Sequence, residues 1–287
     1  RTAPDADALP GDVSAAIIAT PTETHAAVAT ACLEAGRHCL VEKPITRCVD
    51  EGERLVALAA ARQRVLQVGH IERFNPIFRR MSAEIEAPAF VEAERLAPFV
   101  PRSLDVDVIL DLMIHDLDLL LSRMPTDPVA IDGVGVAVLT PREDIANVRL
   151  RFGNGAVANL TASRVSQEKV RKIRFFGPRG YLSLDLLTRS ARRVQIAPGG
   201  EEGFLVPGAG RFAVAQERFD AESGDALSDQ LRSFLEAISR GTPPVVSGGD
   251  GLRALRVAVE IGRAVQASLA ALRDGAGAPP GAPPGTP

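Results

Sequence analysis

Short, largely hydrophobic runs alternate with longer segments in the first quarter of the chain. The runs cover residues 15–19, 38–41 and 65–68, and hydrophobic residues recur at helical spacing in the segments between them. Runs of this length are typical of buried strands, and the intervening segments are long enough to form helices. The pattern therefore predicts βαβ units whose strands form a parallel sheet.

The two intervening segments carry signals for the starts and ends of helices. Thr22 is a candidate N-cap for the first helix, and Gly36 is a candidate stop signal. In the second segment Asp50 is followed three residues later by Glu53, which fits a capping box. We expect a short amphipathic helix at each place.

Polar residues follow each predicted strand. The carboxyl ends of parallel strands meet at one edge of a sheet, where open α/β sheets bind their ligands. We therefore expect a crevice that brings together the following residues: Thr20 with His25 nearby, Glu42 with Lys43, and Gly69 with His70.

A dinucleotide-binding domain normally opens with a strand and a Gly-x-Gly-x-x-Gly loop that lets the backbone approach a pyrophosphate. The sequence has no such loop, and it begins with Arg1. We expect the chain to lack two βα units of about 30 residues each. Residues 1–86 then form the C-terminal part of a Rossmann domain.

Strand patterns dominate after Pro88, which predicts a second domain over residues 87–270. An Asn-Gly pair at 154–155 indicates a type I′ hairpin, and alternation over 147–152 indicates a sheet with one buried face. We expect an α+β domain with a large open, mainly antiparallel sheet, closed by two helices, the second of them capped by Asp250. The Pro/Gly/Ala-rich tail, residues 271–287, is predicted to be disordered. The strands are expected at residues 90–96, 131–139, 147–152, 156–163, 172–176 and 181–186.

The segment 107–122 is hydrophobic around nearly its whole circumference, which predicts a buried helix. Its polar exceptions, Asp111, His115, Asp118 and Ser122, fall on one narrow helical stripe. Buried polar groups need partners, so the stripe must face a partner or a cavity. Asp111 and His115 lie one turn apart, and a carboxylate there can fix the tautomer of the imidazole and make it a better general base.

Composition fits a soluble, cytosolic protein of about two domains. The 287 residues include 33 basic and 36 acidic residues, a net charge of −3 that gives no reason to expect nucleic acid or an anionic membrane. No hydrophobic stretch reaches 18 residues. The three cysteines lack metal-ligand spacing, which favours reduced, packed thiols.

Several of these residues also have ordinary structural explanations. Lys43 alone can be a solvated amine, and an Asp/His pair on a helix can be a structural hydrogen bond or, with further ligands, part of a zinc site. Arg73 can be an ion-pair partner, and Asn75 before Pro76 fits a helix N-cap. His25, His38 and His70 can pack or cap without a role in chemistry.

Four motifs taken together resemble the glucose-fructose oxidoreductase/inositol dehydrogenase/MocA family of nicotinamide-dependent sugar oxidoreductases. Their order and spacing carry the resemblance, which extends to about Leu269. Residues 73–76, 110–116, 144–147 and 159–166 look most like the UDP-N-acetylglucosamine 3-dehydrogenase branch, associated with lipid A precursor synthesis. The four motifs are Ala-Thr-Pro-Thr-Glu-Thr-His at 19–25, Glu-Lys-Pro at 42–44, Val-Gly-His-Ile-Glu-Arg-Phe-Asn-Pro at 68–76, and Asp-Leu-Met-Ile-His-Asp at 111–116.

The resemblance implies an NAD- or NADP-dependent dehydrogenase of a sugar or nucleotide sugar. Lys43 would stabilise negative charge on the substrate oxygen, His115 would accept its proton, and Asp111 would orient His115. The cofactor ribose would be lined by Thr20, Pro21, His25 and Glu42, with Arg73 near cofactor or substrate and Ser163 and Arg164 facing the substrate.

The resemblance further implies a cytoplasmic homo-oligomer that associates through the second-domain sheet. Two other functions stay open: a non-catalytic binding or assembly module, and a glycosidase of the same fold that uses NAD transiently.

Overall fold

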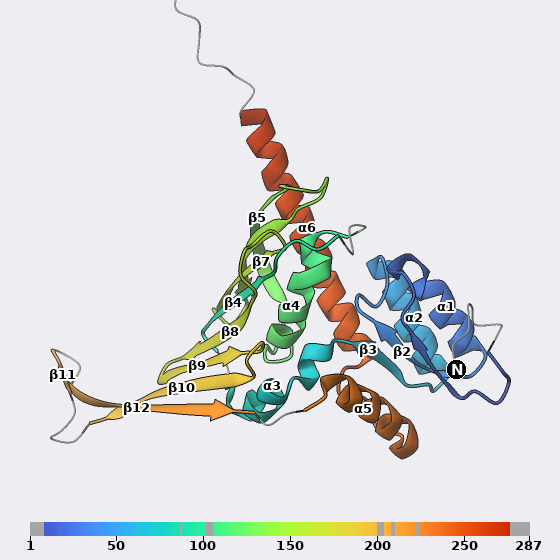
Figure 1. Cartoon of the computed structure of the whole chain (residues 1–287), viewed down its shortest axis with the longest axis horizontal. Helices are drawn as coiled ribbons and strands as arrows, with labels where there is room; N and C mark the ends of the chain where they lie inside the picture. The colour runs from blue at the N-terminus through green and yellow to red at the C-terminus, as the bar shows by residue number, and fades with distance from the viewer. Residues whose placement is uncertain are drawn as a thin grey trace, which may run out of the picture.

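The computed structural model describes residues 9–86, 88–101, 106–199, 204–207, 210–221 and 224–275. Two sheets organise these residues (Figure 1). The smaller one is formed near the N-terminus, and the larger one is formed by the middle of the chain.

The smaller sheet, sheet A, is parallel throughout, with strand order β1-β2-β3. Its strands lie within about one residue of the predicted positions, so the βαβ prediction is confirmed. Gly36 has a φ of +76° just beyond the first helix, which fits its predicted role as a stop signal. The elements are β1 (Ala15–Ile18), α1 (Thr22–Glu34), β2 (His38–Glu42), α2 (Val49–Ala61) and β3 (Leu66–Gly69).

Both predicted N-caps in this part are wrong. Pro21 occupies the N-cap of α1, and Cys48 occupies the N-cap of α2, neither with a side-chain capping bond. Thr22 and Asp50 therefore lie inside the first turns, where the Asp50 carboxylate can still favour the positive helix end. The predicted capping box with Glu53 is absent. The reason is that Pro21 and Cys48 already take the extended backbone that an N-cap needs.

Short helices connect sheet A to the larger sheet. A 3-10 helix, η1 (Ile71–Phe74), is followed by α3 (Pro76–Met81) and by η2 (Ser82–Glu84). Asn75 caps α3 as predicted, because its side chain accepts a hydrogen bond from the backbone N–H of Ile77 at 3.2 Å.

The larger sheet, sheet B, has nine described strands in the order β11-β12-β10-β9-β8-β4-β7-β6-β5. Only the β4–β7 pair is parallel among them, so the prediction of a mainly antiparallel sheet is confirmed. Three strands, β10 to β12, were not predicted. The bounds are β4 (Phe90–Leu96), β5 (Pro128–Val136), β6 (Ile145–Phe152), β7 (Val157–Ser163), β8 (Val170–Gly177), β9 (Gly180–Asp185), β10 (Ser190–Pro198), β11 (Phe204–Val206) and β12 (Gly210–Asp220).

The hairpin between β6 and β7 is present, but its turn is not type I′. The N–H of Gly155 donates to the carbonyl of Phe152 at 3.0 Å, and Gly155 has a φ of +86°. Asn154 does not have a positive φ, which a type I′ turn would require of it. The connection is therefore a type I turn followed by a glycine bulge.

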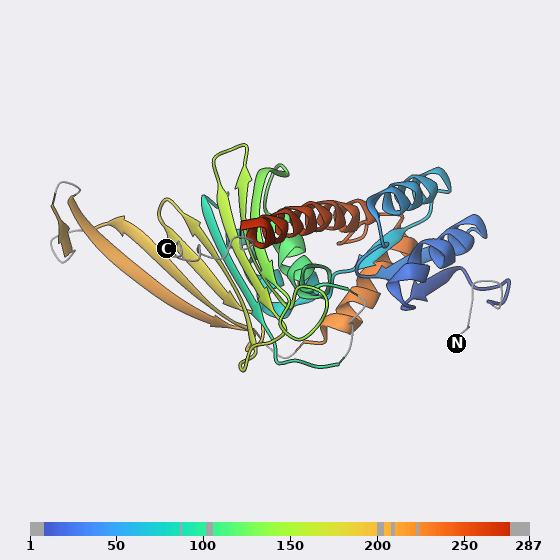
Figure 2. The same cartoon turned by 90° about the horizontal axis from the view of Figure 1, so that it is seen from above.

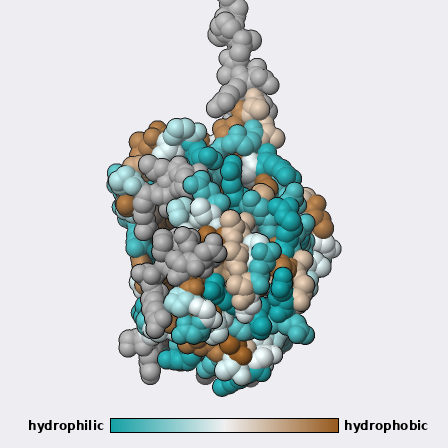
Figure 3. Space-filling view, turned by 90° about the vertical axis from the view of Figure 1, so that its right-hand side faces the viewer, coloured by the Kyte–Doolittle hydropathy of each residue, from teal (hydrophilic) through white to brown (hydrophobic). Residues whose placement is uncertain are grey.

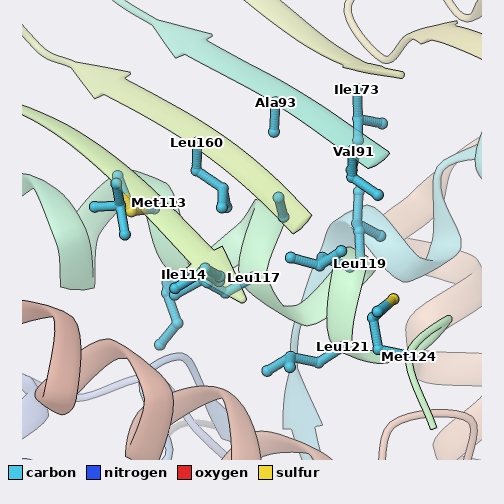
Figure 4. Close-up of a cluster of buried hydrophobic side chains, with 14 of the residues drawn as sticks. Val91, Ala93, Met113, Ile114, Leu117, Leu119, Leu121, Met124, Leu160 and Ile173 are labelled. Atoms are coloured by element: carbon cyan, nitrogen blue, oxygen red, sulfur yellow. The ribbon is translucent and has the colours of Figure 1, made fainter. Parts of the chain in front are cut away.

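Two further helical segments cover one face of sheet B, which we call its inner face; the opposite face is its outward face. The chain passes through a π-helical turn, η3 (Ile109–Met113), and continues directly as α4 (Ile114–Leu121). Figure 4 shows hydrophobic side chains of this segment, among them Met113 and Leu117, pointing towards Leu160 and other residues of the strands. The predicted buried helix is therefore confirmed, with an irregular first half.

The last two helices are α5 (Ala226–Arg240) and α6 (Gly248–Gly275). α6 spans both sheets, as Figures 1 and 2 show. Near its start Gly251 lies so close to Val68 of β3 that a Cβ there would be 2.5 Å from a Val68 methyl, and further along Val265 packs against Gly133 and Gly135 of β5. This single helix therefore fixes sheet A against sheet B.

The predicted disordered tail was placed too early. α6 continues to Gly275, so residues 271–275 are helical, and residues 276–287 lie outside the described part of the chain. Asp250 is not the cap that was predicted, because it lies in the first turn of α6. Ser247 caps the helix: its hydroxyl accepts from the N–H of Asp250 at 3.1 Å, and the Asp250 carboxylate accepts from the N–H of Ser247 at 2.8 Å.

No helix in the described ranges combines the length and the hydrophobicity needed to cross a membrane. The surface seen from the side of sheet A is largely hydrophilic, with hydrophobic residues scattered over it (Figure 3).

Candidate functional site

Lys43 follows β2 and reaches across to the helix that precedes His115. Its Nζ donates to the backbone carbonyl of Asp111 at 2.6 Å and lies 3.3 Å from Asp111 Oδ1. The side chain is only 20% exposed. Burial lowers the pKa of Lys43, and the charge of Asp111 acts in the opposite direction. The ammonium group is therefore held in a fixed position between the two sheets.

His25 supports the turn that carries Lys43. Its Nδ1 lies 2.9 Å from the carbonyl oxygen of Pro44, and its Nε2 lies 2.9 Å from the carbonyl oxygen of Thr20. The side chain is buried. Both ring nitrogens are thus engaged by the backbone, and the ring ties the end of β1 to the residue that follows Lys43.

Glu42 and Gly69 lie side by side at the carboxyl ends of β2 and β3. A Cβ at position 69 would lie 2.7 Å from Glu42 Oε2, so glycine at this position lets the Glu42 carboxyl group pack against the backbone. Burial raises the pKa of Glu42, with Lys43 opposing the shift. Glu42, Lys43 and Gly69 confirm that the predicted strand ends converge.

The predicted hydrogen bond between Asp111 and His115 is not formed. Asp111 contacts Lys43 instead, and Nδ1 of His115 is buried without a hydrogen-bond partner among the described residues. The physical reason is the π-helical turn over residues 109–113, which widens the helix so that residues four apart no longer stack. Such turns are common at functional sites.

His70 is a site residue that sequence reasoning had interpreted as structural. Its ring meets that of His115 edge-on, with 6.5 Å between centroids, and neither of its nitrogens has a partner in the described chain. Burial lowers the pKa of His70 to about 3, helped by Arg73 and Lys43. Its position directly after the third predicted strand was the signal that could have identified it.

Burial also lowers the pKa of His115 well below its ordinary value, and Lys43 next to it adds to the shift. Arg95, His70 and Arg171 lower it further. The imidazole of His115 is therefore neutral near pH 7 and able to accept a proton.

A buried charge network lies beside these residues. Arg95 binds both oxygens of Asp116, at 2.9 and 2.8 Å, and its third nitrogen lies 3.0 Å from Glu72. Arg171 shares the same Glu72 oxygen at 3.2 Å. Because Glu72, Arg95 and Asp116 come from η1, β4 and α4, the network fixes these elements next to His115.

Arg73 takes the ion-pair role that the sequence left open for it. Its Nε lies 3.2 Å from Asp118 Oδ2, and its Nη2 lies 3.7 Å from Asp250. Burial raises the pKa of Asp118 to about 7. Ser122, the last residue of the predicted stripe, donates to the carbonyl of Leu119 at 2.7 Å. Within the predicted stripe, Asp111 and His115 thus belong to the site, whereas Asp118 and Ser122 make structural contacts.

Ser163 and Arg164, predicted to face the substrate, are buried in internal contacts. Arg164 Nε lies 2.9 Å from Asp144, and its Nη1 donates to the carbonyl of Val106 at 3.0 Å. The Ser163 hydroxyl accepts a hydrogen bond from the N–H of Val165 at 3.2 Å. Arg164 therefore anchors the loop before β6 to the segment that leads into η3.

The structure offers no alternative metal centre within the described residues, where no group of three candidate ligands occurs. The three cysteines are free thiols, two of them buried, as expected. The site is thus a cluster of one ammonium group, two imidazoles and carboxylates at the carboxyl ends of sheet A. It can stabilise negative charge and accept a proton.

The sequence matches two successive family descriptions. Residues 2–70 match the oxidoreductase family with an NAD-binding Rossmann fold, and residues 79–183 match the GFO/IDH/MocA C-terminal domain. The parallel sheet A and the larger mixed sheet B fit this two-domain architecture.

Individual relatives extend over most of the chain. UDP-N-acetylglucosamine 3-dehydrogenase from Acidithiobacillus ferrooxidans is 43% identical over 270 residues, which cover 94% of this chain and 84% of that protein. A solved structure of that enzyme, with 42% identity over the same shares of the two chains, matches with a TM-score of 0.84. Myo-inositol 2-dehydrogenase from Thermotoga maritima is 27% identical over 278 residues, covering 90% of this chain and 78% of that protein. The chain therefore belongs to the GFO/IDH/MocA family of NAD-binding oxidoreductases.

Proposed function

We propose that the protein oxidises the 3-hydroxyl of UDP-N-acetylglucosamine and passes the hydride to NAD or NADP. The relative with 43% identity supports this choice of substrate within the family. The observation that carries the proposal is the hydrogen bond at 2.6 Å from Lys43 to Asp111, which holds an ammonium group beside His115.

The residues at the carboxyl ends of sheet A fit a nicotinamide cofactor. Buried polar groups gather there, and both nitrogens of His70 and Nδ1 of His115 have no partner in the described chain. In the proposal, Thr20, Pro21 and Glu42 line the ribose. The bound nicotinamide supplies the hydride acceptor, while the protein supplies orientation and electrostatics.

Lys43 and His115 act together on the reacting hydroxyl. As the proton leaves, negative charge develops on the substrate oxygen, and the ammonium group of Lys43 stabilises it. His115 is the proposed proton acceptor because it is neutral at neutral pH, while the burial that lowers its pKa also makes it a weaker base. Asp111 holds Lys43 in place through its backbone carbonyl and its carboxylate.

His25, predicted to bind the cofactor, acts on the site through the backbone, because carbonyl groups engage both of its nitrogens. Arg73 and Arg164 act in the same indirect way, through Asp118 and Asp144. In the proposal, Ser163 and Arg164 shape the second-domain wall of the substrate site.

We also propose a cytoplasmic homo-oligomer and a role in making a lipid A precursor. The outward face of sheet B supports self-association, because it mixes both charges. Arg174 pairs with Glu92 there at 3.1 Å, and Arg149 donates to Asn159 at 3.2 Å. The division into residues 1–86 and 87–270 is part of the same proposal.

The test is whether the protein reduces the nicotinamide cofactor when UDP-N-acetylglucosamine is supplied. The reduced cofactor is measured by its absorbance. Lys43→Ala and His115→Ala should each lower kcat by about 10²–10³-fold. Lys172→Ala is the matched control, because this lysine is 44% exposed on the outward face of sheet B. Turnover within a few-fold of wild type in both site variants would refute the catalytic roles of Lys43 and His115. Product formation without net cofactor reduction would indicate a glycosidase instead.

A further inference from the structure

Arg171 is an arginine at the edge of the site that has no part in the proposed hydride transfer. It lies near the start of β8, directly opposite Arg95 in the register between β4 and β8. Arg95 is buried beneath the helices, so Arg171 points to the same inner face of sheet B. It therefore lies on the side of the sheet that carries His115.

Arg171 is the most exposed of the four guanidinium groups described near the site, the others being Arg73, Arg95 and Arg164. It makes one hydrogen bond within the described chain, from Nη1 to Glu72 Oε1 at 3.2 Å, and its side chain is 36% exposed. Arg95, in contrast, is 3% exposed and uses three nitrogens on two carboxylates. Part of the Arg171 side chain is thus accessible from solvent.

Glu72 fixes Arg171 in place, while Asp116 supplies Arg95 with a carboxylate of its own. The same Glu72 oxygen also accepts from Arg95 at 3.0 Å, so two guanidinium groups share one carboxylate. A fixed guanidinium loses little conformational entropy when it binds a ligand. Its planar edge can bind two oxygens of one phosphate, which a lysine cannot do.

Arg171 also lies close enough to His115 to influence its charge. In a nucleotide sugar the diphosphate is attached to C1 of the ring, two carbons from the hydroxyl on C3. Arg171 is joined through Glu72 and Arg95 to Asp116, the residue after His115, so an anion-binding group lies on the same side of the sheet as the proton acceptor.

We propose that Arg171 binds the diphosphate of the nucleotide-sugar substrate and so selects it over an uncharged sugar. The proposal rests on the proposed oxidation of a nucleotide sugar and names the residue that recognises the anion. Arg164, which the resemblance placed facing the substrate, instead has its guanidinium paired with Asp144.

The experiment compares Arg171→Gln, Arg171→Lys and Arg179→Gln in the full chain. Arg179 is exposed on the turn after the other end of β8, which makes it the matched control. UDP itself is the probe, and its Kd is measured by calorimetry. Because a hydrogen-bonded charge is lost, Arg171→Gln should raise the Kd for UDP by about 10–100-fold. Arg171→Lys keeps the positive charge but loses the planar guanidinium, so its Kd for UDP should lie between those of wild type and Arg171→Gln. The Kd of Arg179→Gln should match that of wild type.

Kinetics provide the second readout. Arg171→Gln should raise the KM for UDP-N-acetylglucosamine more than it lowers kcat, because the diphosphate takes no part in the hydride step. An unchanged Kd for UDP in Arg171→Gln, or an equal loss in Arg179→Gln, would overturn the proposal. So would absence of UDP binding to the wild-type protein. UDP binding that depends on Arg171, without oxidation of the sugar, would leave this proposal standing and refute the proposed function alone.

Discussion

Lys43 Nζ donates to the backbone carbonyl oxygen of Asp111 at 2.6 Å and thereby joins the carboxyl end of sheet A to the helix that carries His115. Asp111 belongs to the π-helical turn over residues 109–113. The acceptor that orients the ammonium group therefore lies in the irregular part of the segment.

Asp111→Asn separates the backbone contact from the carboxylate charge. Burial lowers the pKa of Lys43 and the Asp111 charge opposes this shift, so removing the charge lowers the pKa of Lys43 further. Lys43 stabilises negative charge only when protonated, and activity is lost as the pH rises through its pKa. We expect the alkaline limb of the pH–kcat profile to move to lower pH, with kcat at neutral pH reduced by about threefold to tenfold. An alkaline limb that stays at its wild-type position would contradict this role of Asp111.

His25 offers a test of how the Lys43 turn is held. An asparagine amide can replace Nδ1 and keep the contact with the Pro44 carbonyl, whereas a glutamine amide can replace Nε2 and keep the contact with the Thr20 carbonyl. If the Pro44 contact positions Lys43, His25→Asn should retain most of kcat and His25→Gln should lose about tenfold.

A readout that is independent of turnover is the acylation rate of Lys43 relative to Lys172, measured by peptide mass spectrometry. His25→Gln should raise this ratio, because Lys43 is then held less firmly in its buried position. Equal ratios and equal loss of kcat in both variants would show that His25 serves stability alone.

The Arg95 network predicts a large effect on stability. Arg95→Met leaves Asp116 and Glu72 buried without their main partner, and breaking a buried pair in this way costs about 3–5 kcal/mol. The free energy of unfolding in urea measures the loss. Arg149→Met on the exposed face of β6 is the control and should stay within about 0.5 kcal/mol of wild type. A loss below about 1 kcal/mol in Arg95→Met would mean that the network contributes little.

The sequence allowed the position of the site to be predicted, but not its internal contacts. Strand ends could be placed because short hydrophobic runs define them, and this brought Glu42, Lys43 and Gly69 together correctly. The prediction of a hydrogen bond between Asp111 and His115 was wrong, because nothing in the sequence of residues 107–122 distinguishes a π-helical turn from a regular helical turn.

The partners of charged residues were harder to predict from the sequence than the positions of strands. Arg164 and Arg171 lie on neighbouring parts of the same sheet, and the choice between them depends on which finds a carboxylate in the folded chain. Asp144, twenty positions before Arg164, pairs with that side chain in the interior, whereas Arg171 shares Glu72 with Arg95. Pairings over such separations follow from tertiary packing and not from local pattern.

Because His70 is buried, we expect the free energy of unfolding to fall in acid. Burial lowers its pKa from 6.5 to about 3 in the folded protein, so the unfolded chain binds a proton more readily than the folded one. The contribution of His70 to stability is therefore fully present above pH 6.5 and is lost progressively as the pH falls towards 3, by at most about 5 kcal/mol.

His70→Phe keeps a ring beside His115 but cannot take up a proton. Unfolding in urea at a series of pH values should show a shallower decline for His70→Phe than for wild type over this range. His38→Phe provides the comparison, since His38, at the start of β2, is only half-buried and accepts a hydrogen bond from the N–H of Val65. Burial lowers the pKa of His38 as well. Parallel curves for His70→Phe and wild type would show that His70 is not held neutral by its burial.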